Sequence, residues 1–218
     1  MRTLRHGIGT SLRRVLCLGA HADDIEIGCG GTILKLLGER PDEIAVDWVV
    51  FSGSEERAAE ARASARAFLA AAKEANVRVE GFRERYFPSI GDRIKDHVAR
   101  LGEEVSPDLV LTHYREDRHQ DHRLISELTY NTFRDHLILE YEIPKYDGDL
   151  GRPEVFVHLD LVHCDRKIDH LLEHFPSQKE RHWFTEDTFR ALMRLRGVES
   201  RAPSGFAEGF HCRKLVLA

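Results

Sequence analysis

Two segments rich in histidine and aspartate carry the side chains of this sequence that could do chemistry. The first is Ala20–Thr32 (AHADDIEIGCGGT), which begins where an apolar run ends. A histidine beside two adjacent carboxylates is unfavourable in such a position unless a cation pairs with them. Histidine offers a neutral nitrogen, aspartate offers an anionic oxygen, and Zn²⁺ accepts both. Adjacent aspartates point in different directions, so one can bind a metal while the other faces water. The alternative is that the Asp pair caps the next helix.

The second segment is Thr112–His122 (THYREDRHQDH), which follows another apolar run. His119 and His122 lie three residues apart and can face one centre from a turn or from the start of a helix. One ring can bind a metal while the other stays free, and Asp121 could orient either ring as a hydrogen-bond acceptor. The alternative is a solvated polar loop.

Short apolar runs alternate with longer helical stretches along the chain. We expect strands at Arg14–Ala20, Ala45–Phe51, Val77–Phe82, Asp108–Thr112, Leu137–Ile143, Val155–Leu159 and Arg213–Leu217. We expect helices at Thr32–Glu39, Glu55–Ala75, Ile94–Val105, Arg123–His136 and Arg166–Phe175. Near-continuous apolar strands are typical of a parallel sheet that is buried on both faces. The pattern predicts one Rossmann-like α/β domain over residues 1–218, with helices on both faces of a mostly parallel sheet and a loosely ordered tail at 1–13. Ligands bind at the carboxyl ends of such strands, where the two segments would converge.

Composition excludes several classes of function. The chain has 218 residues, of which 42% are apolar and 32% charged, and its net charge is −5. That charge does not favour nucleic acid or an anionic membrane. No apolar run approaches the ~20 residues that span a bilayer, and no signal peptide is evident. The four cysteines are scattered without a CxxC pair, so we expect a reducing, cytoplasmic setting.

The two segments resemble the PIG-L/LmbE-type N-acetylglucosaminyl deacetylases, whose signatures are AHPDD and a later HPDH-like motif. Weaker matches follow at residues 52–55 (SGSE), 177–178 (SQ) and 207–210 (AEGF). This resemblance implies that His21, Asp24 and His122 bind the metal. It also implies that Asp23 is the general base and that His119 polarises or protonates the reacting amide.

The sequence departs from the family signature at two positions. Ala22 replaces the usual proline, and Ile25 replaces the usual acid, with Glu26 one place later. Neither position is a ligand in the family, so the implied metal set is unaffected. The departures bear on the stiffness of the turn and hence on the substrate subtype.

The implied activity is removal of an acetyl group from a small N-acetylated sugar or sugar conjugate by metal-activated water. Two histidines and one carboxylate leave Zn²⁺ a free coordination position for water. Fe²⁺, Co²⁺ and Mn²⁺ are alternatives to Zn²⁺ as the single divalent metal. The oxyanion would rest on the metal and on His119, preferably as imidazolium. Family members often assemble, so the resemblance allows a homo-oligomer, but the sequence itself does not indicate an oligomeric state.

Two other functions compete with this interpretation. A metal-dependent phosphoesterase would need a second metal about 3.5–4 Å from the first. A non-catalytic metal or nucleotide sensor would bind its ligand without releasing acetate. The glycines of residues 28–31 do not have GxGxxG spacing, so we expect them to let the chain turn tightly into a helix.

Other polar residues are weaker candidates. Arg57, His113, Glu140 and Asp121 could contact substrate, although His113 could instead fill the core. Glu142 and Asp147 could bind sugar hydroxyls or a second cation. Residues 170–174 (HLLEH) match the inverted zincin pattern HxxEH. The apolar stripe of that helix runs along another side, so we expect a solvated face there.

Overall fold

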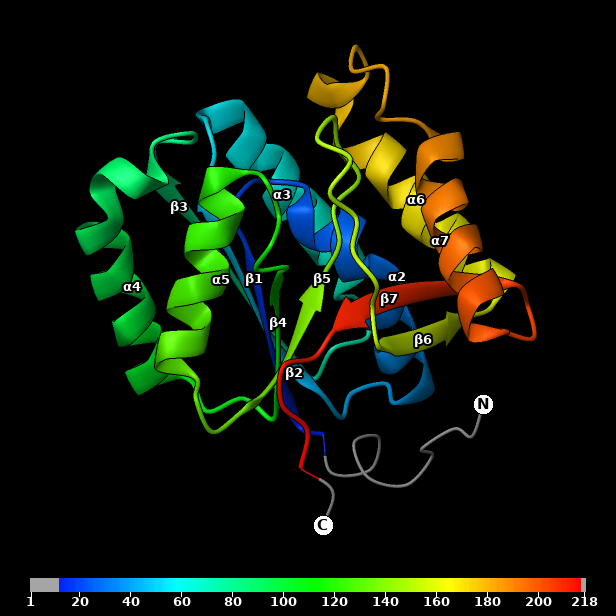
Figure 1. Cartoon of the computed structure of the whole chain (residues 1–218), viewed down its shortest axis with the longest axis horizontal. Coiled ribbons are helices and arrows are strands. Elements are labelled where there is room, and N and C mark those ends of the chain that lie inside the picture. The colour runs from blue at the N-terminus through cyan, green and yellow to red at the C-terminus, as the bar shows by residue number, and fades with distance from the viewer. Residues whose placement is uncertain (1–11, 217–218) are drawn as a thin grey trace.

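The fold is built on one seven-stranded sheet in a computed structural model that describes residues 12–216 (Figure 1). Its strand order is β3-β2-β1-β4-β5-β7-β6, and neighbouring strands from β3 to β5 are parallel. Strand β7 is antiparallel to both β5 and β6. The strands are β1 Arg14–Gly19, β2 Ala45–Ser52, β3 Glu74–Phe82, β4 Leu109–His113, β5 Leu137–Tyr141, β6 Val155–Leu159 and β7 Phe206–His211. The expected mostly parallel sheet is confirmed.

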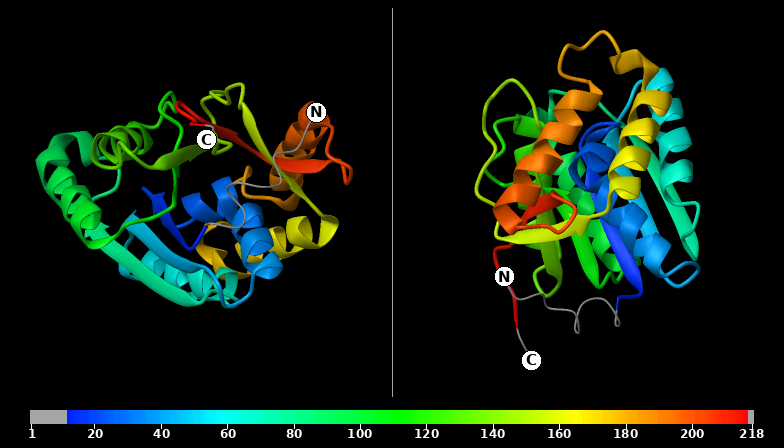
Figure 2. Two further views of the ribbon diagram at one scale, coloured as in Figure 1. Left: turned by 90° about the horizontal axis from the view of Figure 1, so that it is seen from below. Right: turned by 90° about the vertical axis from the view of Figure 1, so that its right-hand side faces the viewer.

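Helices cover both faces of this sheet. They are α2 Asp24–Glu39, α3 Glu55–Phe68, α4 Gly91–Glu104, α5 Gln120–Thr132, α6 Leu161–His174 and α7 Glu186–Ser200, with short 3-10 turns η1 Phe87–Ile90 and η2 Pro176–Gln178. Helices α4 and α5 lie on one face, and α2, α3, α6 and α7 lie on the other (Figures 1 and 2). Each face has its own hydrophobic core, one around Trp48 and the other around Phe51. The Rossmann-like α/β architecture is therefore confirmed.

The strand order places a topological switch between β1 and β4. The chain leaves β1 for β2 on one side, and β4 pairs with the other side of β1. Ligands of open α/β sheets bind in the crevice at such a point, outside the carboxyl ends of the strands. Both histidine- and aspartate-rich segments leave the sheet there.

The glycines of α2 serve close packing and not a turn. The helix begins at Asp24, not at Thr32 as expected, so these glycines lie inside it. A Cβ atom on Gly28 would lie 2.1 Å from the ring of Tyr141, and one on Gly30 would lie 2.6 Å from Phe68. Helix α2 can therefore approach β5 and α3 only because side chains are missing at these positions.

Three other expectations about elements need correction. Helix α3 ends at Phe68 and not at Ala75, because residues 74–75 already pair with β2 as the start of β3. The strand expected at Arg213–Leu217 is wrong over its described part, and β7 lies just before it. Helix α7 was not predicted, since its few buried apolar residues are separated by charged ones. At the end of α3, tertiary pairing overrides local helix propensity.

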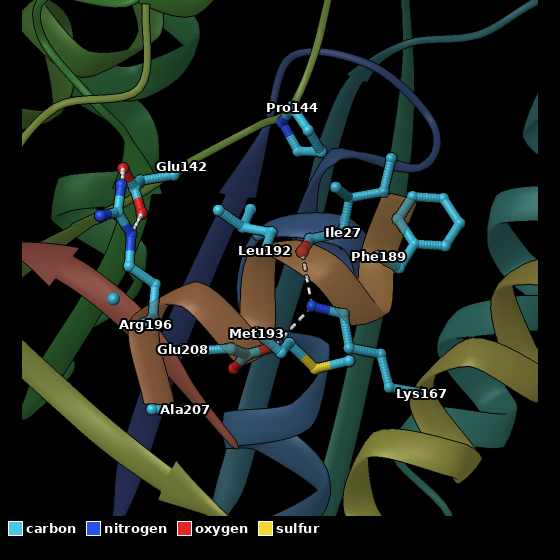
Figure 3. A pocket seen from close by; sticks show the side chains of 12 residues that line it. Ile27, Glu142, Pro144, Lys167, Phe189, Leu192, Met193, Arg196, Ala207 and Glu208 are labelled. Atoms are coloured by element: carbon cyan, nitrogen blue, oxygen red, sulfur yellow. Dashed lines mark hydrogen bonds and ion pairs between the residues drawn. The ribbon is translucent and has the colours of Figure 1, made fainter. Parts of the chain in front are cut away.

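Two buried ion pairs join the helices to the antiparallel end of the sheet (Figure 3). Lys167 donates hydrogen bonds to Glu208 at 2.7 Å and to the carbonyl of Ile27 at 2.6 Å. Arg196 donates two bonds to Glu142, at 2.7 and 2.6 Å. The cavity between the pairs is about 10 Å³, enough for about one water molecule. Glu142 is therefore tied to Arg196 here and does not line the larger cleft described below.

Two expectations concern the ends and the surface of the chain. Residues 1–11 of the expected loose tail lie outside the described residues, whereas Leu12 is buried in the core. Within residues 12–216, no helix is both long and apolar enough to cross a bilayer.

Candidate functional site

Three donor atoms from the two predicted segments meet at the switch point. His21 lies in the loop after β1, Asp24 is the first residue of α2, and His122 lies in the first turn of α5. His21 Nδ1 is 3.1 Å from His122 Nε2 and 3.2 Å from Asp24 Oδ2, and the third side of the triangle is 3.4 Å. Tetrahedral ligands about 2.0–2.1 Å from Zn²⁺ are separated by about 3.3 Å. The three atoms therefore fit one face of a tetrahedral metal site.

Each of the two histidines has a carboxylate on its other ring nitrogen. Asp117 Oδ2 is 2.9 Å from His122 Nδ1, and Asp121 Oδ2 is 3.2 Å from His21 Nε2. Such carboxylate partners fix the orientation of metal-binding imidazoles. Asp117 also accepts the backbone N–H of His119 at 2.7 Å and pairs with Lys145 at 2.9 Å. Asp121 therefore faces His21 as an orienting acceptor, and not His119 or His122 as considered from sequence, whereas Asp117 was missed.

His113 packs against this triangle from the protein interior. Its side chain is fully buried, and its ring stacks on that of His122 with centroids 4.0 Å apart. Its Nε2 is 3.2 Å from Asp24 Oδ2, so it could complete an alternative donor set with Asp24 and His122. That nitrogen, however, accepts the backbone N–H of Ala20 at 2.9 Å. Because the lone pair of His113 Nε2 is already engaged in this hydrogen bond, His21 fits the third ligand position better.

The electrostatics of the triangle favour a cation. Burial lowers the pKa of His21, but the charges of Asp24 and Asp121 outweigh it and raise that pKa to about 10. Burial, reinforced by His113, lowers the pKa of His122 to about 3, which leaves a neutral ligand. Burial alone would raise the pKa of Asp24, yet its three histidine neighbours hold it well below the usual range. A positive charge is therefore stabilised where the three donor atoms meet.

Asp23 is a buried carboxylate that does not cap a helix. It occupies the N-cap position of α2, yet its side chain makes no capping hydrogen bond. Its Oδ1 lies 2.9 Å from Arg57, whose guanidinium also reaches Glu60 at 3.0 Å and Ser177 at 3.2 Å. Burial raises the pKa of Asp23, and Arg57 partly offsets that rise. A carboxylate with a raised pKa suits a general base.

His119 stands at the N-terminus of α5 and faces the same cleft. Its Nδ1 accepts the backbone N–H of Asp121 at 3.2 Å, which leaves the ring proton on Nε2. Burial and the nearby His21 lower the pKa of His119. A lowered pKa favours a neutral ring that donates from Nε2 over the expected imidazolium.

A cleft of about 730 Å³ opens over this group of residues. Of the four proposed substrate contacts, Arg57 lines it, whereas His113 and Asp121 are buried beneath. The structure does not bring Glu140 to the cleft: its side chain is buried and its carboxylate accepts a hydrogen bond from Arg213. Sequence reasoning missed most of the outer wall, which comes from the end of β3, from η2 and from loops. These residues are Gly81, Phe82, Arg83, Glu84, Arg85, Lys145, Tyr146, Gln178, Arg181 and Trp183.

The family model for GlcNAc-PI de-N-acetylase, named PIG-L, matches residues 16–133. This range includes both histidine- and aspartate-rich segments. The chain belongs to the PIG-L family. The resemblance stated from the sequence motifs is thereby confirmed, and the donor triangle lies within the matched part of this PIG-L protein.

Solved structures share the fold of this PIG-L protein along most of its length. The conserved protein TT1542 from Thermus thermophilus is 19% identical with a TM-score of 0.71, over 95% of this chain and 97% of that one. N,N′-diacetylchitobiose deacetylase from Pyrococcus horikoshii is 20% identical with a TM-score of 0.69, over 96% and 86%. GalB, the 4-carboxy-2-hydroxymuconate hydratase from Pseudomonas putida, is 18% identical with a TM-score of 0.71, over 95% and 98%. No curated protein sequence matches the chain. Likeness at this level of identity shows the fold alone.

Proposed function

We propose that this PIG-L protein is a metal-dependent hydrolase that removes the acetyl group from an N-acetylated sugar or sugar conjugate. The observation that carries the proposal is the donor triangle of His21, Asp24 and His122 beside the buried carboxylate of Asp23. The substrate class comes from the family, whose description is GlcNAc-PI de-N-acetylase. The chitobiose deacetylase of similar fold supports the same class of substrate.

The residues of the triangle fit one divalent metal. Two imidazoles and one carboxylate favour Zn²⁺, and Fe²⁺, Co²⁺ or Mn²⁺ would accept the same donors. When bound there, such a metal supplies Lewis-acid polarisation and makes water a better nucleophile near neutral pH. The three donors all line the cleft, so the remaining coordination position would face substrate.

Asp23 and His119 divide the proton transfers between them in this mechanism. Asp23 accepts a proton from the attacking water as the acetamide carbonyl becomes tetrahedral. The Nε2–H of His119 donates a hydrogen bond to the oxyanion that develops on that carbonyl. Asp23 then returns its proton to the leaving nitrogen, the C–N bond breaks, and acetate and a free amine result. Arg57 keeps the Asp23 carboxylate in place throughout.

The shared fold does not decide the reaction, because a hydratase and a deacetylase both have it. The site is less suited to the phosphoesterase alternative, which needs two metal positions. The donor groups found at this edge within residues 12–216 share His122, and so describe one metal position.

The deciding experiment is acetate release from a panel of N-acetylated sugars, with and without a chelator. We expect acetate and a free amine in equal amounts, loss of activity on chelation, and recovery when Zn²⁺, Fe²⁺, Co²⁺ or Mn²⁺ is added back. Turnover that survives chelation would contradict the metal mechanism. Phosphate release from sugar phosphates, with no acetate from any amide, would favour the phosphoesterase. The cytoplasmic location and the homo-oligomer stay predictions.

A further inference from the structure

The last turns of α6 bring together a second group of donor side chains, far along the chain from the first. His170, Glu173 and His174 can each offer one ligand atom, and these atoms all lie within 4.8 Å of one another. The expectation of a solvated face is only partly right. Glu173 is exposed, but His170 is half-buried and packs on the ring of Phe68 in α3, with centroids 5.1 Å apart.

His170 has polar atoms that the protein leaves unsatisfied. Both of its ring nitrogens are buried, and neither has a hydrogen-bond partner. An imidazole nitrogen withdrawn from water without a hydrogen-bond partner destabilises the folded protein. A metal ion on one of these nitrogens would remove part of that penalty. The ring of His174 lies nearly parallel to that of His170, at 24° and 5.7 Å, so both can turn toward a shared ion.

The spacing and position of the three residues suit a transition-metal ion. Residues at i, i+3 and i+4 share one face of a helix, and two histidines four apart are a recurrent Zn²⁺ chelate. The group ends α6, where the unsatisfied carbonyls of the helix favour positive charge.

We propose that His170, Glu173 and His174 form a second metal site, which binds one Zn²⁺ or a similar transition-metal ion at the C-terminal end of α6. It shares no residue with the triangle at the sheet edge, so it stands whether or not the proposed deacetylase reaction is correct. Its position suggests a structural role. Helix α6 leads directly into η2, where Ser177 donates hydrogen bonds to Glu60 at 2.9 and 2.6 Å. An ion here would fix that junction.

The test measures the metal content of two single variants and of the double variant that combines them. Chelator-treated protein is dialysed against low micromolar Zn²⁺, and bound zinc is measured per chain. We expect two ions in the wild type, one in Asp24→Ala, one in His174→Ala, and none in the double variant. Zn²⁺ should also raise the Tm of Asp24→Ala, because ligand that binds only the native state stabilises it. That rise should be absent in the double variant.

Two further variants keep the test sharp if His174→Ala folds poorly. Glu173→Gln changes an exposed side chain and should still lower the affinity for the second ion by more than the ~10–100-fold typical of indirect changes around a metal. His163→Ala removes a half-exposed histidine from the first turn of the same helix and should keep both ions. A zinc content that is the same in His174→Ala and in Glu173→Gln as in the wild type, whatever the wild-type count, would overturn the proposal.

Discussion

The antiparallel end of the sheet and the β1–β4 switch point both bury charge, but they compensate for it differently. At the antiparallel end, Lys167 pairs with Glu208 and Arg196 with Glu142, each at hydrogen-bond distance. At the β1–β4 edge, Asp24 has only histidines as ionisable partners. Within residues 12–216, neither lysine nor arginine side chains pair with Asp24 or with Asp121.

This difference separates structural charges from functional ones. A buried carboxylate is tolerated when an opposite charge and hydrogen bonds satisfy it. The charges around Glu208 are balanced within the protein, and the pair needs nothing from solution. The ionisable neighbours of Asp24 are instead histidines. The raised pKa of His21 indicates that positive charge is favoured beside this carboxylate. The unbalanced region is therefore where a metal is expected, and the balanced region is where removal of a charge should affect only stability.

The largest effect should follow from Asp24→Ala, which removes one corner of the donor triangle. We expect loss of the metal at the sheet edge and a fall in acetate release greater than the ~10²–10⁴-fold typical of losing a general base. Metal content after dialysis and initial rates measure both. Asp147→Asn is the matched control, since Asp147 lines the same cleft but is exposed and outside the triangle. Equal zinc in both variants would show that the donor set is wrong.

Asp23→Asn should separate chemistry from metal binding at the same edge. The asparagine keeps the shape of the side chain but cannot accept the proton from water. We expect the rate to fall by ~10²–10⁴-fold while metal content stays at the wild-type level. Normal turnover would refute the role of Asp23 as base, and lost metal would place Asp23 among the ligands.

Lys167→Met should give the opposite result at the balanced end. Glu208 would keep the backbone N–H groups of Gly31 and Thr32 but lose its charge partner. We expect the free energy of unfolding to fall by about 3–5 kcal/mol, with metal content unchanged. Urea unfolding and metal analysis of the same sample measure the two quantities. Unchanged stability would mean that the ion pair is not what holds α6 to β7.

The architecture could be predicted from the sequence in more detail than the contacts of single side chains. The apolar runs predicted the parallel strands, because such strands are buried on both faces and leave a clear signal. Chain order along the sheet then placed His21, Asp24 and His122 at one edge. The glycines of α2 were wrongly interpreted as a tight turn. They are needed for close packing against Tyr141 and Phe68, which lie far away in sequence. Local patterns cannot report such contacts.

Single side chains within the site were harder to assign for the same reason. Asp117 lies in a run of charged residues, and only the fold shows that it reaches His122. A signal did exist, since an acid five residues before a ligand histidine can face its second nitrogen across the helix start. Glu140 was expected to face substrate, but its carboxylate accepts a hydrogen bond from Arg213, which follows the last strand. The partner that decides each role comes from another element.

Asp117→Asn should weaken the site without destroying it. Its carboxylate orients His122 from the far side of the ring, and loss of such a partner lowers metal affinity by ~10–100-fold. Zn²⁺ titration against a competing chelator gives the affinity. Asp149→Asn is the control, because Asp149 binds the same Lys145 as Asp117 but has no contact with His122. If both variants lose affinity equally, Lys145 and not the histidine contact is responsible.

The smallest effect should be a shift in pH dependence when Arg57 is replaced. Burial raises the pKa of Asp23, and the charge of Arg57 lowers it again. A general base works only when deprotonated, so activity is lost as the pH falls through this pKa. Arg57→Gln removes the lowering influence, so the acidic limb of kcat/KM should move to higher pH, while Arg57→Lys should restore much of the original profile. An unmoved limb with a raised KM would mean that Arg57 serves substrate binding. In that case the charge of Asp23 would be balanced by the metal alone, and the contrast between the switch point and the antiparallel end of the sheet would be greater still.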